Sequence, residues 1–221
     1  MRRFRRLCRK KPDPPGKPST LTGELNNGGN MTALHTPQQL DSLIRGSMDG
    51  EMMLVSIDGP CGSGKTTLSE KLSLDFGWQI IHMDDYYLPW KRRADDWQER
   101  VAGNMDLLRI EDELLQPLSE NKSARYRAYD CRRDVFTKSS VIPAKGIIAV
   151  EGNYSQMPQL RRYFRQSVYV TLPRDLRLQR LKAREGSYYA VFEKVWEPLD
   201  QRYQKTLHIR AHADVIYQEM L

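Results

Sequence analysis

The glycine-rich segment SIDGPCGSGKTTL, residues 56–68, constrains the fold of this 221-residue chain more than any other part of it. It matches the pattern G-x-x-x-x-G-K-[ST] in full, with Gly59 and Gly64 at the glycine positions and Lys65 and Thr66 after them. Backbone N–H groups in such a loop converge on phosphates when a strand precedes the loop and a helix follows it. The segment therefore predicts a nucleoside triphosphate site at a strand–loop–helix junction.

The residues on either side have the patterns that this junction requires. Residues 52–58, MMLVSID, form a short apolar run typical of a buried strand. After the loop, Leu68, Leu72 and Phe76 recur every four residues, which places them on one face of a helix. We therefore expect a strand over 52–58 and, directly after the loop, a helix that packs against it.

The rest of the chain alternates between apolar runs and helical patterns. A helix over 35–48 is predicted because Thr36 can cap it, Pro37 suits its first position and Gln39 completes a capping box. Apolar runs follow at 78–83, 146–150, 167–172 and 213–217, with helical patterns near 107–118, 174–185 and 188–208. Pro198 is expected to interrupt or bend the last helix. Alternating strands and helices predict an α/β fold, a mostly parallel sheet with helices on both faces.

The positive charge of the chain is confined to its first residues. Residues 1–18 hold eight basic residues and one acidic residue, so they account for the whole net charge of +7 and leave the remainder neutral. The basic, proline-rich tail over 1–30 is predicted to be disordered, and Met31 is an alternative start of translation. Residues 31–221 are expected to form a single domain, whose neutral charge balance favours no nucleic-acid partner.

Composition indicates a soluble protein. Hydrophobic residues make up 39% of the chain, and no run of about 18 apolar residues could span a membrane, so no membrane association is expected. Three widely spaced cysteines do not suggest a disulfide framework, which makes the reducing cytoplasm the expected location. Whether the chain forms a homo-oligomer stays open.

The glycine loop supplies the expected nucleotide-binding residues. Lys65 should reach the β- and γ-phosphates of ATP, and the hydroxyl of Thr66 should bind Mg²⁺. The residues expected to hold the nucleotide are Gly59, Pro60, Cys61, Gly62, Ser63, Gly64, Lys65, Thr66 and Thr67.

Acidic residues follow two further apolar runs. Asp84 and Asp85 directly follow the run at 78–83, and Glu151 directly follows the run at 146–150. The carboxyl ends of parallel strands meet at one edge of a sheet, so these acids should face the glycine loop. A carboxylate there can accept a proton from a substrate hydroxyl or hold Mg²⁺ directly or through water. Thr66, Asp84 and Glu151 are therefore the candidate metal residues.

A basic stripe lies on a later helix. In RDLRLQRLKAREG, residues 174–186, the arginines Arg177, Arg180 and Arg184 stand at i, i+3 and i+7, on one helix face. On a mobile lid, here predicted over about 174–188, such a stripe neutralises a transferring phosphoryl group and excludes water. A solvated basic face is the alternative.

These four elements, in this order, resemble the uridine kinase/phosphoribulokinase/pantothenate kinase group of P-loop kinases, over residues 52–217. The resemblance implies the three-layer fold of P-loop NTPases with an arginine-bearing lid. It implies that Asp84, the first acid of a D-x-[FY]-Y element, is the catalytic base, with Tyr86 of the same element near the substrate. It also implies that Glu151 is the strand-end glutamate and that the other catalytic residues are Lys65, Arg177, Arg180 and Arg184.

Uridine kinases are the nearest pattern within the group. GNMDLL, residues 103–108, resembles their N-F-D-H-P element, which implies that Asp106 holds ribose hydroxyls. RAYDCRRD, residues 127–134, resembles their P-x-Y-D-F-x-x-H-x-R element, which implies that Tyr129 lies against the base and that Arg133 is near the substrate. The chain departs from these patterns at Leu107, Leu108, Ala128 and Asp134, so the acceptor stays open.

The elements together predict an ATP-dependent phosphotransferase with an alcohol group as acceptor, a uridine-like nucleoside being the first candidate. A sister kinase for pantothenate, a sugar or another metabolite would differ mainly in the acceptor-binding insert, residues 88–138, whose basic residues would suit an acidic acceptor. A GTPase-type switch would need a guanine-reading N-K-x-D element, and NKSA at 121–124 lacks the aspartate. A nucleic-acid-stimulated ATPase is disfavoured by the neutral charge of residues 31–221.

Overall fold

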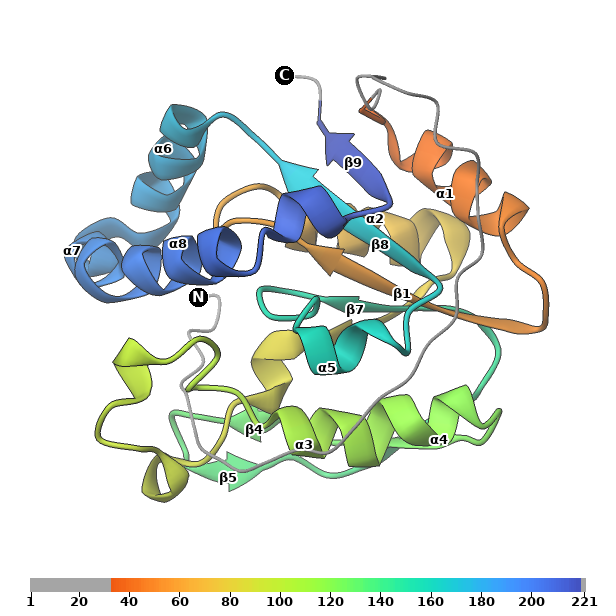
Figure 1. Cartoon of the computed structure of the whole chain (residues 1–221), viewed down its shortest axis with the longest axis horizontal. Helices are drawn as coiled ribbons and strands as arrows, with labels where there is room; N and C mark the ends of the chain where they lie inside the picture. Colours follow the sequence, from red (N-terminus) through yellow and green to blue (C-terminus); the bar gives the residue numbers. More distant parts are fainter. Residues whose placement is uncertain (1–32, 220–221) are drawn as a thin grey trace.

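A single parallel sheet forms the centre of residues 33–219, the part of the chain that the computed structural model describes. The predicted tail over 1–30 lies outside these residues. The strand order is β2–β7–β1–β8–β9 (Figure 1). The strands are β1 Met52–Asp58, β2 Gln79–His82, β7 Gly146–Glu151, β8 Gln166–Thr171 and β9 Val215–Gln218, and each confirms a predicted apolar run. Because β1 is central, its loop opens at the carboxyl edge between two neighbouring strands, where open α/β sheets bind ligands.

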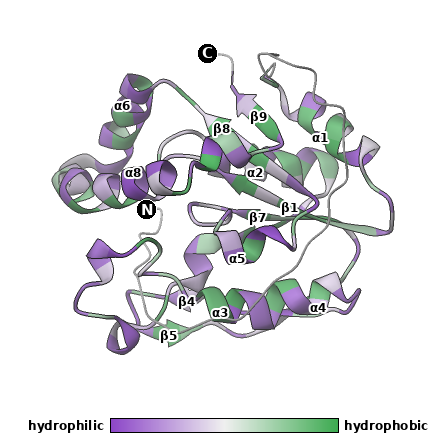
Figure 2. Cartoon of the chain, viewed as in Figure 1, coloured by the Kyte–Doolittle hydropathy of each residue, from purple (hydrophilic) through white to green (hydrophobic). Residues whose placement is uncertain are grey.

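Helices cover both faces of the sheet and make three layers. α1 (Pro37–Gly46) and α2 (Lys65–Phe76) pack on one face through side chains that include Leu40, Ile44, Leu68 and Leu72. The other face is covered by α3 (Leu107–Ile110), α4 (Gln116–Ser119), α5 (Pro158–Arg161) and α8 (Glu197–Thr206). Figure 2 shows hydrophobic residues along the central strands and on the helices beside them. The predicted three-layer α/β fold is confirmed.

The first helix begins as its sequence predicts. The Gln39 N–H donates to Thr36 Oγ1 at 3.2 Å, and the Thr36 N–H donates to Gln39 Oε1 at 3.0 Å. Pro37 occupies the first turn. The reciprocal bonds of the capping box therefore set the start of α1.

Two prolines inside helical segments each follow a π turn. The π turn Glu111–Leu115 leads into α4 and Pro117, and the π turn Phe192–Trp196 leads into α8 and Pro198. A proline in a regular helix lacks an N–H donor and clashes with the carbonyl four residues earlier. The wider i→i+5 turn relieves this conflict. Pro198 was expected to interrupt or bend the helix. The turn before it widens instead, and α7 (Tyr189–Val191) continues through this π turn into α8 without a break.

The predicted lid and insert lie at the margins of the sheet. Residues 174–188 form α6 (Arg174–Glu185) and the 3₁₀ turn Gly186–Tyr188, beside α7 and α8 (Figure 1). The insert, residues 88–138, consists of the 3₁₀ turns Trp90–Arg92 and Trp97–Glu99, then α3, a π turn, α4, β3 Ala124–Tyr126, β4 Tyr129–Asp130 and β5 Val135–Phe136. β3 pairs antiparallel with β6 (Ser140–Ile142), and β4 pairs antiparallel with β5. Within residues 33–219, no helix is both long enough and apolar enough to cross a membrane.

A fully buried carboxylate ties the end of β1 to later parts of the chain. Asp58 Oδ1 accepts the Gly59 N–H at 2.6 Å, while its Oδ2 accepts the Gln156 N–H at 3.1 Å and the Tyr203 hydroxyl at 2.7 Å. Burial raises the pKa of Asp58, and Lys65 and these hydrogen bonds oppose that rise. The carboxylate therefore joins the glycine loop to the segment after β7 and to α8.

We expect Asp58→Asn to lower the free energy of unfolding by about 1–3 kcal/mol, measured by urea denaturation. Each oxygen of Asp58 accepts a backbone N–H, so either amide orientation of the new side chain sets an NH₂ group against a donor that cannot turn away. Asp112→Asn, at an exposed position of the insert, is the control. An unchanged denaturation midpoint for Asp58→Asn would contradict the expectation.

Candidate active site

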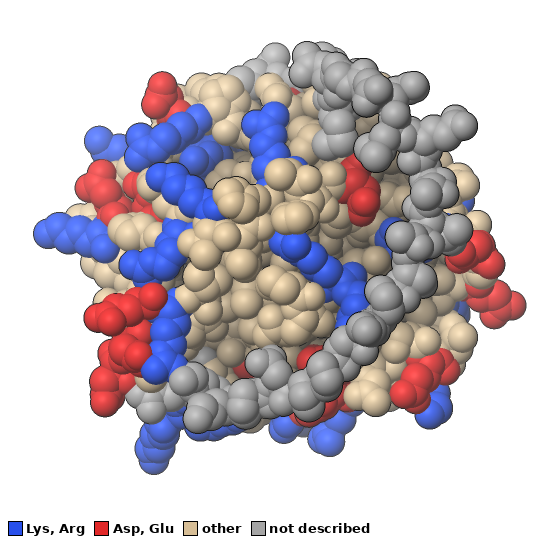
Figure 3. Space-filling view, in the orientation of Figure 1, with Lys and Arg blue, Asp and Glu red and all other residues tan. Residues whose placement is uncertain are grey.

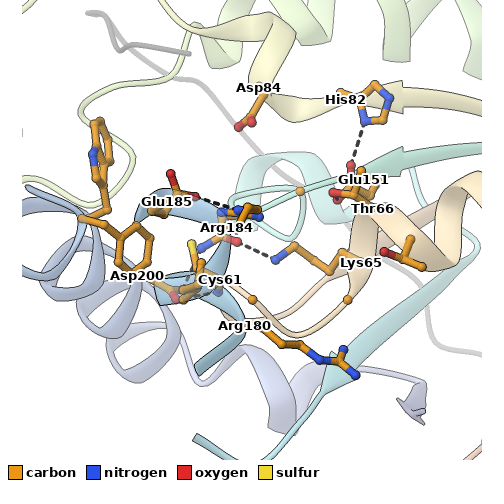
Figure 4. A pocket seen from close by; sticks show the side chains of 18 of the residues that line it. Cys61, Lys65, Thr66, His82, Asp84, Glu151, Arg180, Arg184, Glu185 and Asp200 are labelled. Carbon is orange, nitrogen blue, oxygen red and sulfur yellow. Dashed lines mark hydrogen bonds and ion pairs between the residues drawn. The ribbon is translucent and has the colours of Figure 1, made fainter. Parts of the chain in front are cut away.

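A pocket of about 750 Å³ opens at the carboxyl edge of the sheet, beside the glycine loop. It lies between the ends of β1, β2 and β7 on one side and α6 to α8 on the other (Figure 4). Of the residues predicted from the sequence, those that line it are Cys61, Gly62, Gly64, Lys65, Thr66, Thr67, Asp84, Glu151, Arg180 and Arg184. Segments of the chain as far apart as Cys61 and Asp200, 139 residues, therefore meet at one site.

Glycine is required at two loop positions by close contacts. A Cβ atom on Gly59 would stand 2.1 Å from the carbonyl oxygen of Val170, and one on Gly62 would stand 2.8 Å from that of Arg177. Gly62 and Gly64 also have positive φ angles of 79° and 99°. A side chain at these positions would be strained, so glycine keeps the loop backbone close to α6 and wrapped around the start of α2. This geometry fits a phosphate-binding loop.

Lys65 lies inside the loop that it follows. Its Nζ donates to the carbonyl oxygens of Gly59 and Pro60 and, at 2.9 Å, to Asn153 Oδ1. Only 8% of Lys65 is exposed. Three neutral oxygens therefore hold the ammonium group at the loop, where phosphate oxygens would replace them as its partners.

Hard oxygen ligands stand next to the loop. Thr66 Oγ1 donates to Glu151 Oε1 at 3.2 Å, and His82 Nδ1 lies 2.8 Å from Glu151 Oε2, so its N–H donates there (Figure 4). The register of β2 and β7 sets His82 opposite Glu151. A threonine hydroxyl and a carboxylate beside a phosphate loop match the ligands that Mg²⁺ prefers. These residues therefore fit an Mg²⁺ ion bound with ATP.

We expect His82→Ala to weaken Mn²⁺ binding in the presence of ADP by about 10-fold, measured by electron paramagnetic resonance. His82 holds one oxygen of Glu151, so its loss lets the carboxylate turn away from Thr66. His212→Ala, at an exposed position on the far end of the chain, is the matched control. Unchanged Mn²⁺ affinity in His82→Ala would show that Glu151 needs no such support.

The two neighbouring acids after β2 have different surroundings. They lie on the 3₁₀ turn Met83–Tyr86, where Asp84 is exposed to the pocket and Asp85 is 1% exposed. The Tyr87 hydroxyl donates to Asp84 Oδ1 at 2.7 Å, and burial together with Asp84 raises the pKa of Tyr87. Tyr126 donates instead to Asp85, outside the pocket. Only the first acid can therefore meet a substrate in this pocket.

The arginine stripe of α6 is divided between three partners. Arg177 Nη1 donates to the Cys61 carbonyl oxygen at 2.8 Å, Arg180 Nη1 lies 3.5 Å from Glu219 Oε2, and Arg184 Nε lies 2.6 Å from Glu185 Oε1. Arg180 points away from Asp84 in Figure 4. Figure 3 shows other Lys and Arg side chains on the side of α6 and α8, with Asp and Glu among them. A lid function of this stripe stays a prediction.

Asp200 is a site residue that sequence reasoning missed. It lies on α8, is 4% exposed and lines the pocket. Its carboxylate accepts the Cys61 N–H at 2.8 Å and the Asn153 Nδ2–H at 2.7 Å. Burial raises the pKa of Asp200, and burial, with Asp200 next, raises that of the Cys61 thiol. Asn153 directly follows Glu151-Gly152 and could have been suspected, whereas no local pattern marks Asp200.

Two insert residues that the resemblance assigned to the acceptor form internal contacts. Asp106 is 4% exposed, and its Oδ2 lies 3.0 Å from Arg92 Nη1 and 3.7 Å from Arg109 Nε. Burial raises the pKa of Asp106, and the two arginines oppose that rise. Tyr129 is 1% exposed and donates to Asp134. Neither Asp106 nor Tyr129 is among the residues that line the pocket.

The remaining predicted substrate residues also lie away from it. Tyr86 is fully buried, with the Arg109 guanidinium 4.3 Å from its ring centroid. Burial raises the pKa of Tyr86. Arg133 is exposed on the insert, with its Nε 4.0 Å from Asp130 Oδ2. Contact of these residues with an acceptor stays a prediction.

Solved structures of several kinases share this fold. No protein-family model matches the sequence, and no curated protein matches it. A possible uridine kinase from Bacillus stearothermophilus superposes with a TM-score of 0.64 at 22% identity, over 82% of this chain and 97% of that one. A proposed fructose transport system kinase from Silicibacter sp. TM1040 gives 0.62 at 19% identity, over 82% and 98%. D-glycerate 3-kinase from Cryptococcus neoformans gives 0.50 at 18% identity, over 76% and 89%.

These likenesses show that the chain has the fold of the P-loop kinases. They confirm, at the level of the fold, the resemblance to the uridine kinase/phosphoribulokinase/pantothenate kinase group that the motifs predicted. The three proteins differ in the acceptors that their names state, so the shared fold leaves the acceptor open.

Proposed function

We propose that this chain is a kinase that transfers the γ-phosphoryl group of Mg-ATP to a hydroxyl group of a small molecule. The observation that carries the proposal is the pocket that joins Lys65 and Thr66 of the glycine loop to Asp84 at the end of β2. The kinase names of the structural neighbours support it. A uridine-like nucleoside is the first acceptor to test, and pantothenate, a sugar or another metabolite are the alternatives. The cytoplasmic location and the lack of nucleic-acid or membrane partners stay predictions.

Each group in the pocket has a role in such a transfer. The loop N–H groups and Lys65 would hold the β- and γ-phosphates, and Thr66 with Glu151 would hold Mg²⁺, which offsets phosphate charge when bound. Asp84 would accept the proton of the acceptor hydroxyl as its oxygen attacks the γ-phosphorus. A new O–P bond forms, the bond to the bridging oxygen breaks, and ADP leaves. Arg180 and Arg184 on α6 would offset the charge of the transferring group if the lid closes.

Acceptor-dependent release of ADP tests the proposal. The full chain is incubated with Mg-ATP or Mg-GTP and a panel of nucleosides, pantothenate and sugars, and phosphorylated products are identified by ³¹P NMR. We expect one class of acceptor to raise ADP release well above the rate without acceptor. Nucleotide hydrolysis that no acceptor raises would contradict a kinase and favour an ATPase or GTPase.

A further inference from the structure

The part of the pocket beyond Asp84 is lined by aromatic and polar side chains. We define the acceptor end as the pocket residues Tyr87, Asn104, Tyr154, Glu185, Phe192 and Trp196. Asp84 and Glu185 face the same part of the pocket in Figure 4, away from the group formed by Thr66, Glu151 and His82. An acceptor whose hydroxyl meets Asp84 would therefore contact these residues.

Within residues 33–219, no positive charge at the acceptor end is left uncompensated. The Glu185 side chain is 2% exposed, and Arg184, the cation beside it, is paired with it at 2.6 Å. The other Lys and Arg residues that line the pocket are Lys65 and Arg180. Lys65 is held by the glycine loop. Arg180 lies at the same loop, because its Nη1 is 3.6 Å from the position that a Cβ atom on Gly64 would occupy. A carboxylate or phosphate on the acceptor would meet Asp84 and the neutral Arg184–Glu185 ion pair, so in this partly buried site no cation would offset its charge.

The basic residues of the insert add no positive charge to the acceptor end. Arg92 is paired with Asp106, and Arg127 is paired with Glu113. The Arg93 guanidinium carbon lies 3.0 Å from the centroid of the Trp90 ring. None of these three arginines lines the pocket. These three insert arginines, which would have suited an acidic acceptor, therefore have partners elsewhere.

The acceptor end does offer uncharged polar atoms. Asn104 is 2% exposed and hydrogen-bonds to the hydroxyl of Tyr154, yet its Oδ1 has no hydrogen-bond partner within residues 33–219. Trp196 Nε1, a donor, likewise has no partner in that part of the chain. Buried polar atoms are nearly always satisfied, by protein, by ordered water or by a bound ligand. One acceptor atom and one donor atom match hydroxyl groups, which both donate and accept.

Aromatic rings complete the wall. Phe192 and Trp196 line the pocket from the π turn before α8, and the Trp196 ring lies 6.3 Å from that of Trp97 in the insert. Such rings pack against the apolar face of a sugar or a base.

We infer that the acceptor is uncharged and carries several hydroxyl groups, as sugars, polyols and nucleosides do, and that acceptors bearing a carboxylate or phosphate are rejected. This inference rests on the proposed kinase function. It names Glu185 as the residue that occupies Arg184 and so leaves an anionic acceptor without a cation, and it names Asn104 and Trp196 as hydrogen-bonding partners of acceptor hydroxyls.

Pairs of acceptors that differ mainly in charge test the inference. ADP release is measured for D-glycerate against glycerol and for pantothenate against pantothenol, with uridine and D-fructose as separate arms for nucleosides and sugars. We expect the uncharged member of each pair to give the higher kcat/KM. We also expect either uridine or D-fructose to give a higher kcat/KM than the other. A higher kcat/KM for the anionic members, or for a cationic amino alcohol, would overturn the inference and leave the kinase function standing.

Variants separate charge from hydrogen bonding. Trp196→Phe is expected to raise the KM of the acceptor about 3- to 10-fold through loss of one N–H donor, with the KM of ATP unchanged. Glu185→Gln is expected to reduce the preference for the uncharged member of each pair. Glu193→Gln on the same helical segment and Lys91→Ala in the insert, both exposed and outside the pocket, are the matched controls. A changed acceptor KM in Lys91→Ala, with none in Trp196→Phe, would overturn the assignment.

Isothermal titration of the same compounds into the full chain with Mg-ADP distinguishes failure of the proposed kinase function from failure of the inferred acceptor class. Binding of an uncharged acceptor without phosphoryl transfer would contradict the kinase function and support the inferred class of ligand. Absence of binding for every uncharged compound would overturn the inference itself.

Discussion

Asp84→Asn is expected to lower kcat for acceptor phosphorylation by about 10²- to 10⁴-fold, because the amide cannot accept the hydroxyl proton. The affinity for ATP, measured by isothermal titration, should stay nearly unchanged, since Asp84 lies on the turn after β2 and not in the glycine loop. The size and shape of the side chain are preserved, and Asp84 is exposed to the pocket, so folding should be unaffected. Stopped assays of ADP and phosphorylated product report the rate.

The neighbouring acid is a contrast for this prediction. Asp85→Asn removes a carboxylate that is buried and bonded by Tyr126 outside the pocket, so it should act on stability more than on kcat. Asp112→Asn, exposed in the insert, controls for the loss of one negative charge. If Asp84→Asn retained wild-type kcat in a folded protein, Asp84 would not be the base.

Lys65→Met is expected to lower kcat/KM for ATP by at least about 10²-fold, because the ammonium group offsets charge on the phosphates as they react. The substitution also leaves the Gly59 and Pro60 carbonyl oxygens and Asn153 without this donor, so the loop should lose order as well as charge. Nucleotide affinity is measured by titration with ADP, and turnover by ADP release.

The helix that Lys65 begins contains its own control. Lys71→Met removes an exposed lysine of α2, which is paired with Glu219 at 3.4 Å and lies outside the pocket. Circular dichroism melting of both variants shows whether the fold survives. Equal activity of the two variants would contradict a phosphate-binding role for Lys65.

Features that depend on neighbours in sequence were predicted well. The strand–loop–helix junction, the capping box of α1 and the apolar runs of the five central strands each depend on periodicity or capping within about ten residues. The sheet edge that gathers Lys65, Asp84 and Glu151 follows from parallel strand order, which the alternation of strands and helices already indicates.

Features that depend on tertiary packing were not predictable in the same way. Asp200 accepts the Cys61 N–H from 139 residues away, and nothing near Asp200 in the sequence marks it as a site residue. The acceptor positions implied for Asp106 and Tyr129 rest on short motifs. In the structure, Arg92 and Arg109 contact Asp106, and Asp134 contacts Tyr129, and these partners come from separate turns of the insert. Pro198 was expected to interrupt or bend its helix, and the π turn before it absorbs the conflict.

The sequence by itself therefore determined the α/β fold, the glycine loop and the acids at the strand ends, because spacing along the chain encodes strands, helices and loop contacts locally. Only the tertiary structure decided which side chains face the pocket. Asp84 and Asp85 are adjacent in sequence, yet one reaches the pocket and the other is buried against Tyr126. Glu185, Asn104 and Trp196 meet at the acceptor end from separate segments, since long-range packing, and no local pattern, brings them together.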